Sequence, residues 1–321
     1  MGEQTEQIVQ EQLLKYFSNE LKDSSITYNK APTQLTGGQV TKMYKFHLNH
    51  VPDHLNIPLV IRIFPISLRR GHAIKEGMVQ NALKEAGYPV PRVFFIGEEP
   101  SIFDTEFIIM EFMPGEPLGN MPLDDIPEIL ARLHAELHKV DPLPLMKQLG
   151  NPPNDIYLYS IFDYLEVLIN RMNQERLQPG LDWLIENRPK PESPVICHGD
   201  FHPGNILYYQ DAVSAVLDWG TFRFEEPTYD VVCTRMVLSV LGPVFYPMID
   251  WDDFVGRYYE RYRKENPLDS ERVDYFDAVK LLKSLHELDY GLKVWSTPGV
   301  EKRLIEAFRE KTGVKIESKL Y

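Results

Sequence analysis

One polar segment of the chain carries most of the residues that could do chemistry. It reads Val-Ile-Cys-His-Gly-Asp-Phe-His-Pro-Gly-Asn-Ile-Leu over 195–207, and the stretch Val-Leu-Asp-Trp-Gly follows at 216–220. Asn205 stands five positions after Asp200, and Asp218 stands thirteen positions after Asn205. The apolar residues before each aspartate predict a strand that delivers its carboxylate into a loop.

Two carboxylates and an amide in this order suit phosphoryl transfer. One carboxylate must orient an attacking hydroxyl and accept its proton, and Asp200 suits that task. Oxygen ligands must hold Mg²⁺ on the phosphates of a nucleotide, because Mg²⁺ prefers carboxylate, carbonyl and phosphate oxygens. Asn205 and Asp218 suit that second task.

The HGDxHxxN loop and the DWG motif resemble those of the aminoglycoside phosphotransferase and choline kinase family, small-molecule relatives of the protein kinases. The order of motifs extends the resemblance over nearly the whole chain. It implies a bilobal, protein-kinase-like α+β fold with a β-rich N-terminal lobe and a mostly helical C-terminal lobe. It also implies an enzyme that moves the γ-phosphate of a nucleoside triphosphate, with Mg²⁺, to a hydroxyl of an aminoglycoside-, macrolide-, choline- or sugar-like acceptor.

A cation in the first lobe is expected to steady the nucleotide phosphates. Arg62 is a lone charge in the apolar stretch 59–64, and such a charge is costly unless it is paired. Glu76, on the next predicted helix, is the candidate partner, and Glu85 on another face of that helix is the alternative. In the resembling family this position is often lysine, whereas arginine keeps the charge and offers two N–H groups to a phosphate. A structural Arg–Glu pair without a nucleotide is the competing interpretation.

Two further segments are expected to contact the nucleotide. Gly37 and Gly38 form a predicted turn before the Arg62 strand, where backbone N–H groups could approach phosphate oxygens. An ordinary hairpin turn is the alternative, because the pair lacks a full GxGxxG run. The resemblance places Glu111 and Met113 at the hinge between the lobes, where backbone groups would bind the base, so ATP and GTP are not distinguished.

Two pairs of histidines permit other interpretations. A metal-dependent phosphohydrolase could use His198 and His202 with Asp200, since histidine and aspartate are common ligands of zinc and iron; loop-shaping histidines are the simpler interpretation. His134 and His138 lie four positions apart on a predicted helix and could also bind a metal, or simply pack in the core. A catalytically silent, kinase-like binding protein is a further alternative, against which the intact aspartate–asparagine–aspartate set argues.

The acceptor is expected to lie against the C-terminal helices. Their aromatic and acidic side chains would suit a cationic or amphipathic small molecule, and a helical core with an acidic surface is the alternative. Glu225 and Glu226 follow the DWG motif closely and are candidate acceptor contacts. Asp230 is a good helix N-cap, and the resemblance adds that an aspartate here braces the catalytic loop.

Charge and composition limit the classes of molecule that the protein is expected to bind. The chain has 321 residues with 34 lysines and arginines against 47 aspartates and glutamates, a net charge of −13, which argues against nucleic-acid and anionic-membrane surfaces. Two cysteines, Cys197 and Cys233, cannot form a disulfide framework for a chain of this length. The polar N-terminus has no secretory pattern, so we expect a cytoplasmic protein, and the sequence leaves its oligomeric state open.

The Pro/Gly-containing segment 113–117 marks the predicted boundary between the lobes. Residues 1–112 are expected to form the nucleotide-binding lobe, with helices at 7–21 and 73–86 and strands at 42–48, 59–64, 93–96 and 107–112. Residues 113–321 are expected to form the catalytic lobe, with short strands at 195–197 and 215–217 and helices at 124–140, 156–172, 181–187, 230–241, 252–264, 271–294 and 300–312.

Overall fold

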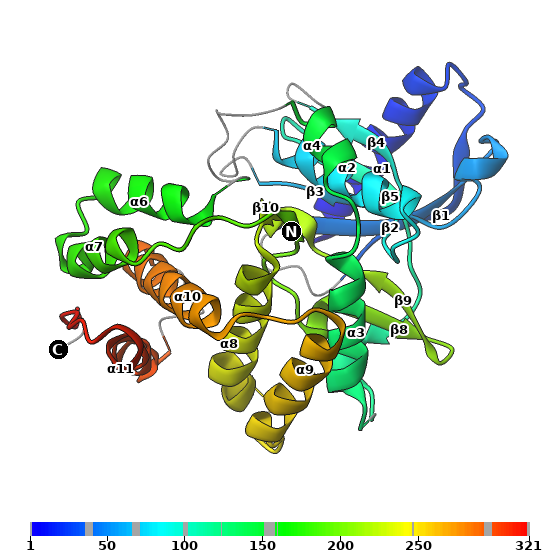
Figure 1. Cartoon of the computed structure of the whole chain (residues 1–321). Coiled ribbons are helices and arrows are strands. Elements are labelled where there is room, and N and C mark those ends of the chain that lie inside the picture. The colour runs from blue at the N-terminus through cyan, green and yellow to red at the C-terminus, as the bar shows by residue number, and fades with distance from the viewer. Residues whose placement is uncertain are drawn as a thin grey trace. The chain divides into compact units, whose positions relative to one another are not determined.

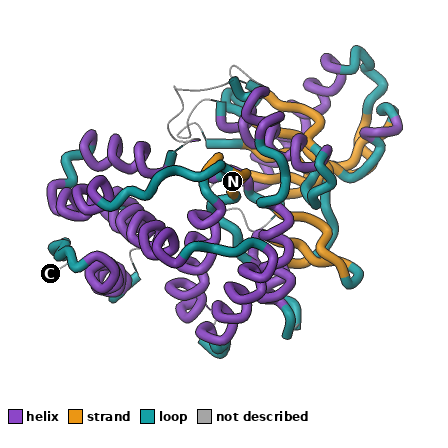
Figure 2. The backbone as a smooth tube through the Cα atoms, in the orientation of Figure 1, coloured by secondary structure: helices purple, strands orange, loops and turns teal. Residues whose placement is uncertain are grey.

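The computed structural model of the chain has mixed α+β architecture (Figures 1 and 2). It describes residues 2–35, 41–65, 71–98, 102–122, 124–150, 158, 160–245, 247–291 and 297–319. Two compact units are formed, the first from Met1–Asn120 with Ile206–Gly220 and the second from Met121–Asn205 with Thr221–Tyr321. The predicted lobe boundary at 112/113 stays a prediction.

The first unit is built around a five-stranded antiparallel sheet of order β1-β2-β3-β5-β4. In chain order its elements are α1 (Gly2–Glu20), β1 (Thr27–Gln34), β2 (Lys42–Asn49), β3 (Leu59–Ile63), α2 (His72–Glu85), β4 (Val93–Gly97) and β5 (Phe107–Glu111). A second, three-stranded sheet in this unit has the order β6-β8-β9, from Glu116–Pro117, Ile206–Tyr209 and Ala212–Val216.

Alternation along the central strands builds a core on each face of the five-stranded sheet. Ile61 of β3 and Ile109 of β5 pack in one buried cluster with Phe17 of α1. Val60 and Ile108, one position earlier on each strand, pack in another cluster with Ala73 of α2. Because side chains alternate along a strand, Arg62 lies on the same face as Val60. The strand therefore presents its only charge toward the helix that carries Glu76.

The sequence did not predict β1, and its residues explain why. Thr27–Gln34 reads TYNKAPTQ, and only one of its eight positions is buried. It lies at the edge of the sheet, where a proline such as Pro32 is tolerated because a donor is not needed on the open side. Without alternating apolar residues, pairing with β2 rather than local pattern defines this strand.

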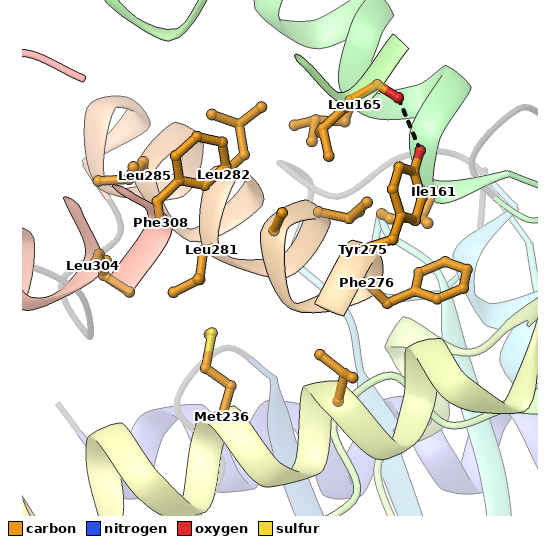
Figure 3. Close-up of a cluster of buried hydrophobic side chains, with 14 of the residues drawn as sticks. Ile161, Leu165, Met236, Tyr275, Phe276, Leu281, Leu282, Leu285, Leu304 and Phe308 are labelled. Carbon is orange, nitrogen blue, oxygen red and sulfur yellow. Dashed lines mark hydrogen bonds between the residues drawn. The ribbon is translucent and has the colours of Figure 1, made fainter. Parts of the chain in front are cut away.

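The second unit is mostly helical. Its elements are α3 (Ile126–Leu137), α4 (Leu143–Gln148), α6 (Ile161–Arg171), α7 (Gln178–Glu186), the paired strands β7 (Val195–Cys197) and β10 (Arg223–Glu225), α8 (Pro227–Phe245), α9 (Trp251–Glu265), α10 (Ser270–Tyr290) and α11 (Val300–Thr312). Figure 3 shows apolar side chains of α6, α8, α10 and α11 packed together, with α10 contributing Phe276, Leu281, Leu282 and Leu285. Among the described residues, no helix has the length and apolar character needed to cross a bilayer.

The predicted helices of this unit are present with shifted ends. In the segment predicted to be helical from 156, Leu158 is helical and α6 begins at Ile161, whereas residues 151–157 and 159 lie outside the described part of the chain. The helix predicted to end at 294 ends at Tyr290, and residues 292–296 likewise lie outside it.

Candidate functional site

The loop that carries Asp200 is shaped by its backbone. Gly199 adopts φ +81°, and a Cβ atom there would lie 2.6 Å from the carbonyl oxygen of Thr221. The left-handed conformation and the close approach both require glycine. The Thr221 hydroxyl also donates a hydrogen bond of 2.9 Å to the carbonyl of His198. The turn out of β7 is thus fixed on both sides of Gly199.

The histidines around Asp200 shape the loop. The Nδ1 atom of His198 accepts a 3.2 Å hydrogen bond from the backbone N–H of Asp200. The Nδ1 atom of His202 accepts one of 3.1 Å from the N–H of Gly204. These contacts support the loop-shaping interpretation, and these histidines with Asp200 do not form a metal-binding group among the described residues.

Asp200 is ionised and half-exposed. Burial raises the pKa of its carboxyl, but the hydrogen bond from His202 and the positive charges of His202, His198 and Lys280 outweigh it and lower the pKa to about 2. Its side chain remains 43% exposed. A carboxylate of this kind is charged at neutral pH and reachable by a second molecule.

Asn205 is fixed against the same loop. Its Nδ2 atom donates hydrogen bonds to the Asp200 carbonyl at 3.0 Å and, at 3.5 Å, to the Asp200 carboxylate. Because the amide nitrogen is used in this way, the oxygen Oδ1 is the atom left to face a cation. The residue directly precedes β8 in the chain.

Asp230, in the first turn of α8, holds the loop from inside. Its fully buried carboxylate accepts hydrogen bonds from the backbone N–H groups of His198 at 2.6 Å and Gly199 at 2.8 Å. It also contacts the Nε2 atoms of His134 at 3.0 Å and His138 at 3.2 Å. Burial raises the pKa of Asp230, but these histidines lower it well below its ordinary value.

His134, His138 and Asp230 could geometrically hold a metal ion, but their hydrogen bonds favour another role. The Nδ1 atoms of the two histidines contact the hydroxyls of Tyr258 at 2.8 Å and Tyr262 at 2.6 Å. All four ring nitrogens are therefore engaged. Burial, followed by the His138 charge, lowers the pKa of His134 to about 4, so a neutral ring that accepts from tyrosine and donates to Asp230 fits the geometry.

The sequence analysis counted Tyr258 and Tyr262 of α9 among the aromatic residues of the C-terminal helices but did not predict their contacts with His134 and His138. Tyr258 and Tyr262 are four positions apart, like His134 and His138, and α9 packs against α3. Two pairs with the spacing of one helical turn can meet along facing helices. That matched spacing was the available signal.

In the first unit the structure brings together Arg62, Glu76 and Asp218. Arg62 donates hydrogen bonds from Nη1 to Glu76 at 2.7 Å and from Nη2 to Asp218 at 2.9 Å. Its Nε atom donates to the hydroxyl of Thr41 at 3.1 Å, a residue that the sequence did not single out. The expected Arg62–Glu76 pair is present, and its role in nucleotide binding stays a prediction.

The two carboxylates that contact Arg62 differ in their exposure to solvent. Glu76 is 1% exposed, whereas Asp218 is 50% exposed. Burial raises the pKa of Glu76 to about 7, with the Arg62 charge opposing it and the Asp218 charge adding to it. Glu76 thus fixes the arginine from inside the unit, and Asp218 presents its carboxylate to solvent.

Asp218 stands just beyond β9 in an uncommon backbone conformation. Its φ is +65°, which costs a residue with a side chain about 1–2 kcal/mol. Trp219 anchors the turn, because its ring is fully buried and its Nε1 donates to the carbonyl of Val216 at 3.1 Å. A Cβ atom on Gly220 would lie 3.0 Å from His72 of α2. The turn is therefore held closely against the helix that carries Glu76.

In the predicted hinge, Glu111 and Met113 differ in whether their backbone groups form hydrogen bonds within the protein. The N–H of Glu111 donates to the carbonyl of Arg92 at 2.9 Å, and its carboxylate contacts Lys84 at 3.1 Å. Among the described residues, Met113 makes no backbone hydrogen bond. Gly37 and Gly38, expected to cover the phosphates, lie outside the described residues.

Glu225 and Glu226, the candidate acceptor contacts, are engaged with the protein. Glu225 accepts hydrogen bonds from the backbone N–H groups of Ile161 at 2.9 Å and Glu226 at 3.1 Å. Glu226 accepts one from the N–H of Glu192 at 3.0 Å and pairs with Arg272 at 2.5 Å. These contacts give both residues a structural role, and acceptor contact stays a prediction.

Comparison with solved structures defines the class of fold. An aminoglycoside phosphotransferase in a ternary complex with ADP and hygromycin B aligns with a TM-score of 0.63 at 18% identity, over 94% of this chain and 99% of that one. A spectinomycin phosphotransferase in complex with ADP and spectinomycin aligns with a TM-score of 0.54 at 14% identity, over 94% and 93%. The chain therefore has the kinase-like α+β fold of the aminoglycoside phosphotransferases, as predicted.

Comparison of sequences defines the family. Residues 33–276 match the model of the phosphotransferase enzyme family, and the chain belongs to that family. Among curated proteins, acyl-CoA dehydrogenase family member 10 of Mus musculus is 28% identical over 214 residues, which cover 60% of this chain and 20% of that protein. Acyl-CoA dehydrogenase family member 11 of Homo sapiens is 25% identical over 198 residues, covering 57% and 25%. The chain thus spans about a fifth to a quarter of these relatives' length.

Proposed function

We propose that this phosphotransferase moves the γ-phosphate of ATP or GTP to a hydroxyl of a small molecule, with Asp200 as the catalytic residue. The observation that carries the proposal is the state of Asp200, which is ionised, held by loop contacts and still 43% exposed. A group with a pKa of about 2 is a weak base. Its main contribution is to orient the hydroxyl, and it accepts the proton late, which suits a loose transition state.

The nucleotide would be held through its phosphates, a metal ion and its base. Arg62, fixed by Glu76 and Thr41, would donate to the phosphates. Asn205 and Asp218 would hold Mg²⁺, and their donor set fits because both present oxygen atoms. The bound ion would neutralise phosphate charge. We propose that Asn205 and Asp218 converge on this ion, and that the unused backbone of Met113 binds the base.

The test is Mg²⁺-dependent nucleotide consumption with a panel of acceptors. The panel contains aminoglycosides, macrolides, choline and sugars. It also contains hydroxylated acyl-CoA thioesters, because the curated relatives are named as acyl-CoA dehydrogenase family members. Asp200→Asn should lower transfer at least 1,000-fold, about 4 kcal/mol of transition-state stabilisation, while nucleotide still binds. The matched control Asp163→Asn, at a surface pair with Arg188, should transfer at the wild-type rate.

The alternatives give different results. Nucleotide binding without turnover on any acceptor would favour a silent binding protein. A stoichiometric zinc or iron ion, with phosphate-ester hydrolysis that survives nucleotide removal, would favour a metal-dependent phosphohydrolase. Equal transfer by wild type and Asp200→Asn would contradict the assignment of Asp200.

A further inference from the structure

The second unit contains a buried ammonium group that the proposed catalysis does not use. Lys280 lies in the middle of α10 and is 5% exposed. Its Nζ atom makes no hydrogen bond or ion pair with any residue that the structure describes. A charge removed from water is costly unless it is paired, so an unpaired buried lysine needs an explanation.

The buried carboxylates of this unit are engaged elsewhere. Asp230 holds the catalytic loop, and Glu226 pairs with Arg272. Asp277, one turn earlier on α10, pairs with Arg235 and Lys311. Glu301 pairs with Arg176. These four buried carboxylates all have partners, and none of those partners is Lys280.

Packing links α10, the helix that carries Lys280, to the strand before the catalytic loop. Phe276, one turn before it, contacts the ring of Tyr229 on α8, with centroids 6.1 Å apart. The Arg223 guanidinium lies 5.2 Å from the same ring, and Arg223 pairs in the β10–β7 ladder with Cys197, three residues before Asp200. Arg223 and Lys280 are thus two buried cations on elements that packing links to β7, the strand before the catalytic loop.

The charges of Lys280 and Asp200 influence each other. Burial acts to lower the pKa of Lys280, but Cys233, Glu287 and Asp200 outweigh it and raise the pKa, with Arg223 opposing them. Lys280 in turn helps to lower the pKa of Asp200. Glu287 itself pairs with Lys283. The ammonium is therefore charged, close enough to Asp200 to act on it, and without a counterion in contact.

We propose that Lys280 binds an anionic group, a carboxylate or a phosphate, on the hydroxylated acceptor and selects acceptors that carry one. The proposal rests on the proposed function, because Asp200 defines where the acceptor hydroxyl stands. It reverses the expectation of a cationic acceptor. Glu225 and Glu226, which would receive a cation, are engaged by backbone N–H groups and Arg272, and the available buried charge is positive.

Anion binding by the intact chain tests the proposal without knowledge of the acceptor. Equilibrium dialysis of radiolabelled inorganic phosphate, without nucleotide and at constant ionic strength, should show saturable binding that acetate displaces. Lys280→Met should weaken phosphate binding at least tenfold, and Lys280→Arg should retain it within threefold. Arg62→Met, which alters the proposed nucleotide site, should leave it unchanged. No saturable binding, or equal binding by Lys280→Met, would overturn the proposal.

Two further readouts separate this role from others. Without phosphate, Lys280→Met should melt at or above the wild-type temperature, because it removes an unpaired buried charge; a lower melting temperature would mean a structural role and overturn the proposal. ATP affinity should stay within twofold, since a large loss would assign Lys280 to the nucleotide phosphates instead.

Acceptor pairs connect the site to catalysis. Among acceptors that turn over, a hydroxy acid should exceed its amide at least tenfold in kcat/KM, mainly through KM, and Lys280→Met should reduce that ratio below twofold. An unchanged ratio would overturn the proposal. If Asp200→Asn retained transfer while Lys280→Met lost phosphate binding, the assignment of Asp200 would fail and the anion site would stand.

Discussion

Replacing Asp230 with asparagine tests how the catalytic loop is held. The wild-type carboxylate is fully buried and accepts from four donors, two backbone N–H groups of the loop and the two histidines of α3. Asparagine keeps the shape but loses the charge, and its NH₂ group faces donors. Oδ2 accepts three of these hydrogen bonds and Oδ1 accepts only the one from Gly199, so the NH₂ group is best tolerated at the Oδ1 position. The lost hydrogen bond to a charged group contributes about 1.5–3 kcal/mol, and leaving the buried Gly199 N–H unpaired costs about 1–3 kcal/mol more. We expect the free energy of unfolding to fall by about 4 kcal/mol.

Urea-induced unfolding followed by far-UV circular dichroism measures this loss, because the helices dominate that signal. Asp163→Asn is the matched control. It changes a half-exposed pair with Arg188, and such pairs contribute at most about 1 kcal/mol. In surviving folded protein, kcat should fall with little change in nucleotide affinity, because Asp230 contacts the loop that carries Asp200. A loss below about 1 kcal/mol for Asp230→Asn, or an equal loss for Asp163→Asn, would contradict the role of Asp230 in holding the loop.

Three other predictions follow from single contacts. The pKa of His134 is lowered from 6.5 to about 4, so between these pH values the unfolded chain binds more protons than the folded chain. The contribution of this residue to the free energy of unfolding, about 3 kcal/mol, is therefore lost as pH falls from 6.5 toward 4. Urea unfolding across that range should show a smaller slope of the unfolding free energy against pH for His134→Gln than for the wild type, and equal slopes would contradict the prediction. Gly199→Ala forces a Cβ atom against Thr221, so it should lower the free energy of unfolding by about 1–3 kcal/mol and also lower kcat. Thermal unfolding and turnover measure the two effects, and a wild-type melting temperature would contradict the loop geometry. Arg62→Lys keeps the charge but loses the forked contacts with Glu76 and Asp218, so calorimetry should show roughly tenfold weaker nucleotide binding, whereas unchanged affinity would remove Arg62 from the site.

Local pattern was sufficient for the elements that carry the motifs. The apolar runs at β3, β5 and β7 predict strands because buried central strands need continuous or alternating apolar residues. The Arg62–Glu76 pair could be predicted because a charge in such a strand must be neutralised by a residue on the neighbouring helix. These inferences need only the residues of one or two adjacent elements.

Features that depend on distant segments could not be predicted in this way. The edge strand β1 has no apolar alternation of its own, and β8 and β9 join β6 across almost a hundred residues. Tyr258 and Tyr262 contact His134 and His138 across 124 positions. Packing also determines that Glu225 accepts a hydrogen bond from the N–H of Ile161. It likewise leaves Lys280 without a partner among the described residues.

We propose that Asn205 and Asp218 share one metal ion beneath the nucleotide. Crystals grown with Mn²⁺ in place of Mg²⁺ and a non-hydrolysable ATP analogue would locate the ion by anomalous diffraction. We expect one peak at coordination distance, about 2.1–2.2 Å, from both the Asn205 amide oxygen and the Asp218 carboxylate. An ion bound by His134, His138 and Asp230 instead, or one that contacts Asp218 with Asn205 out of reach, would contradict it.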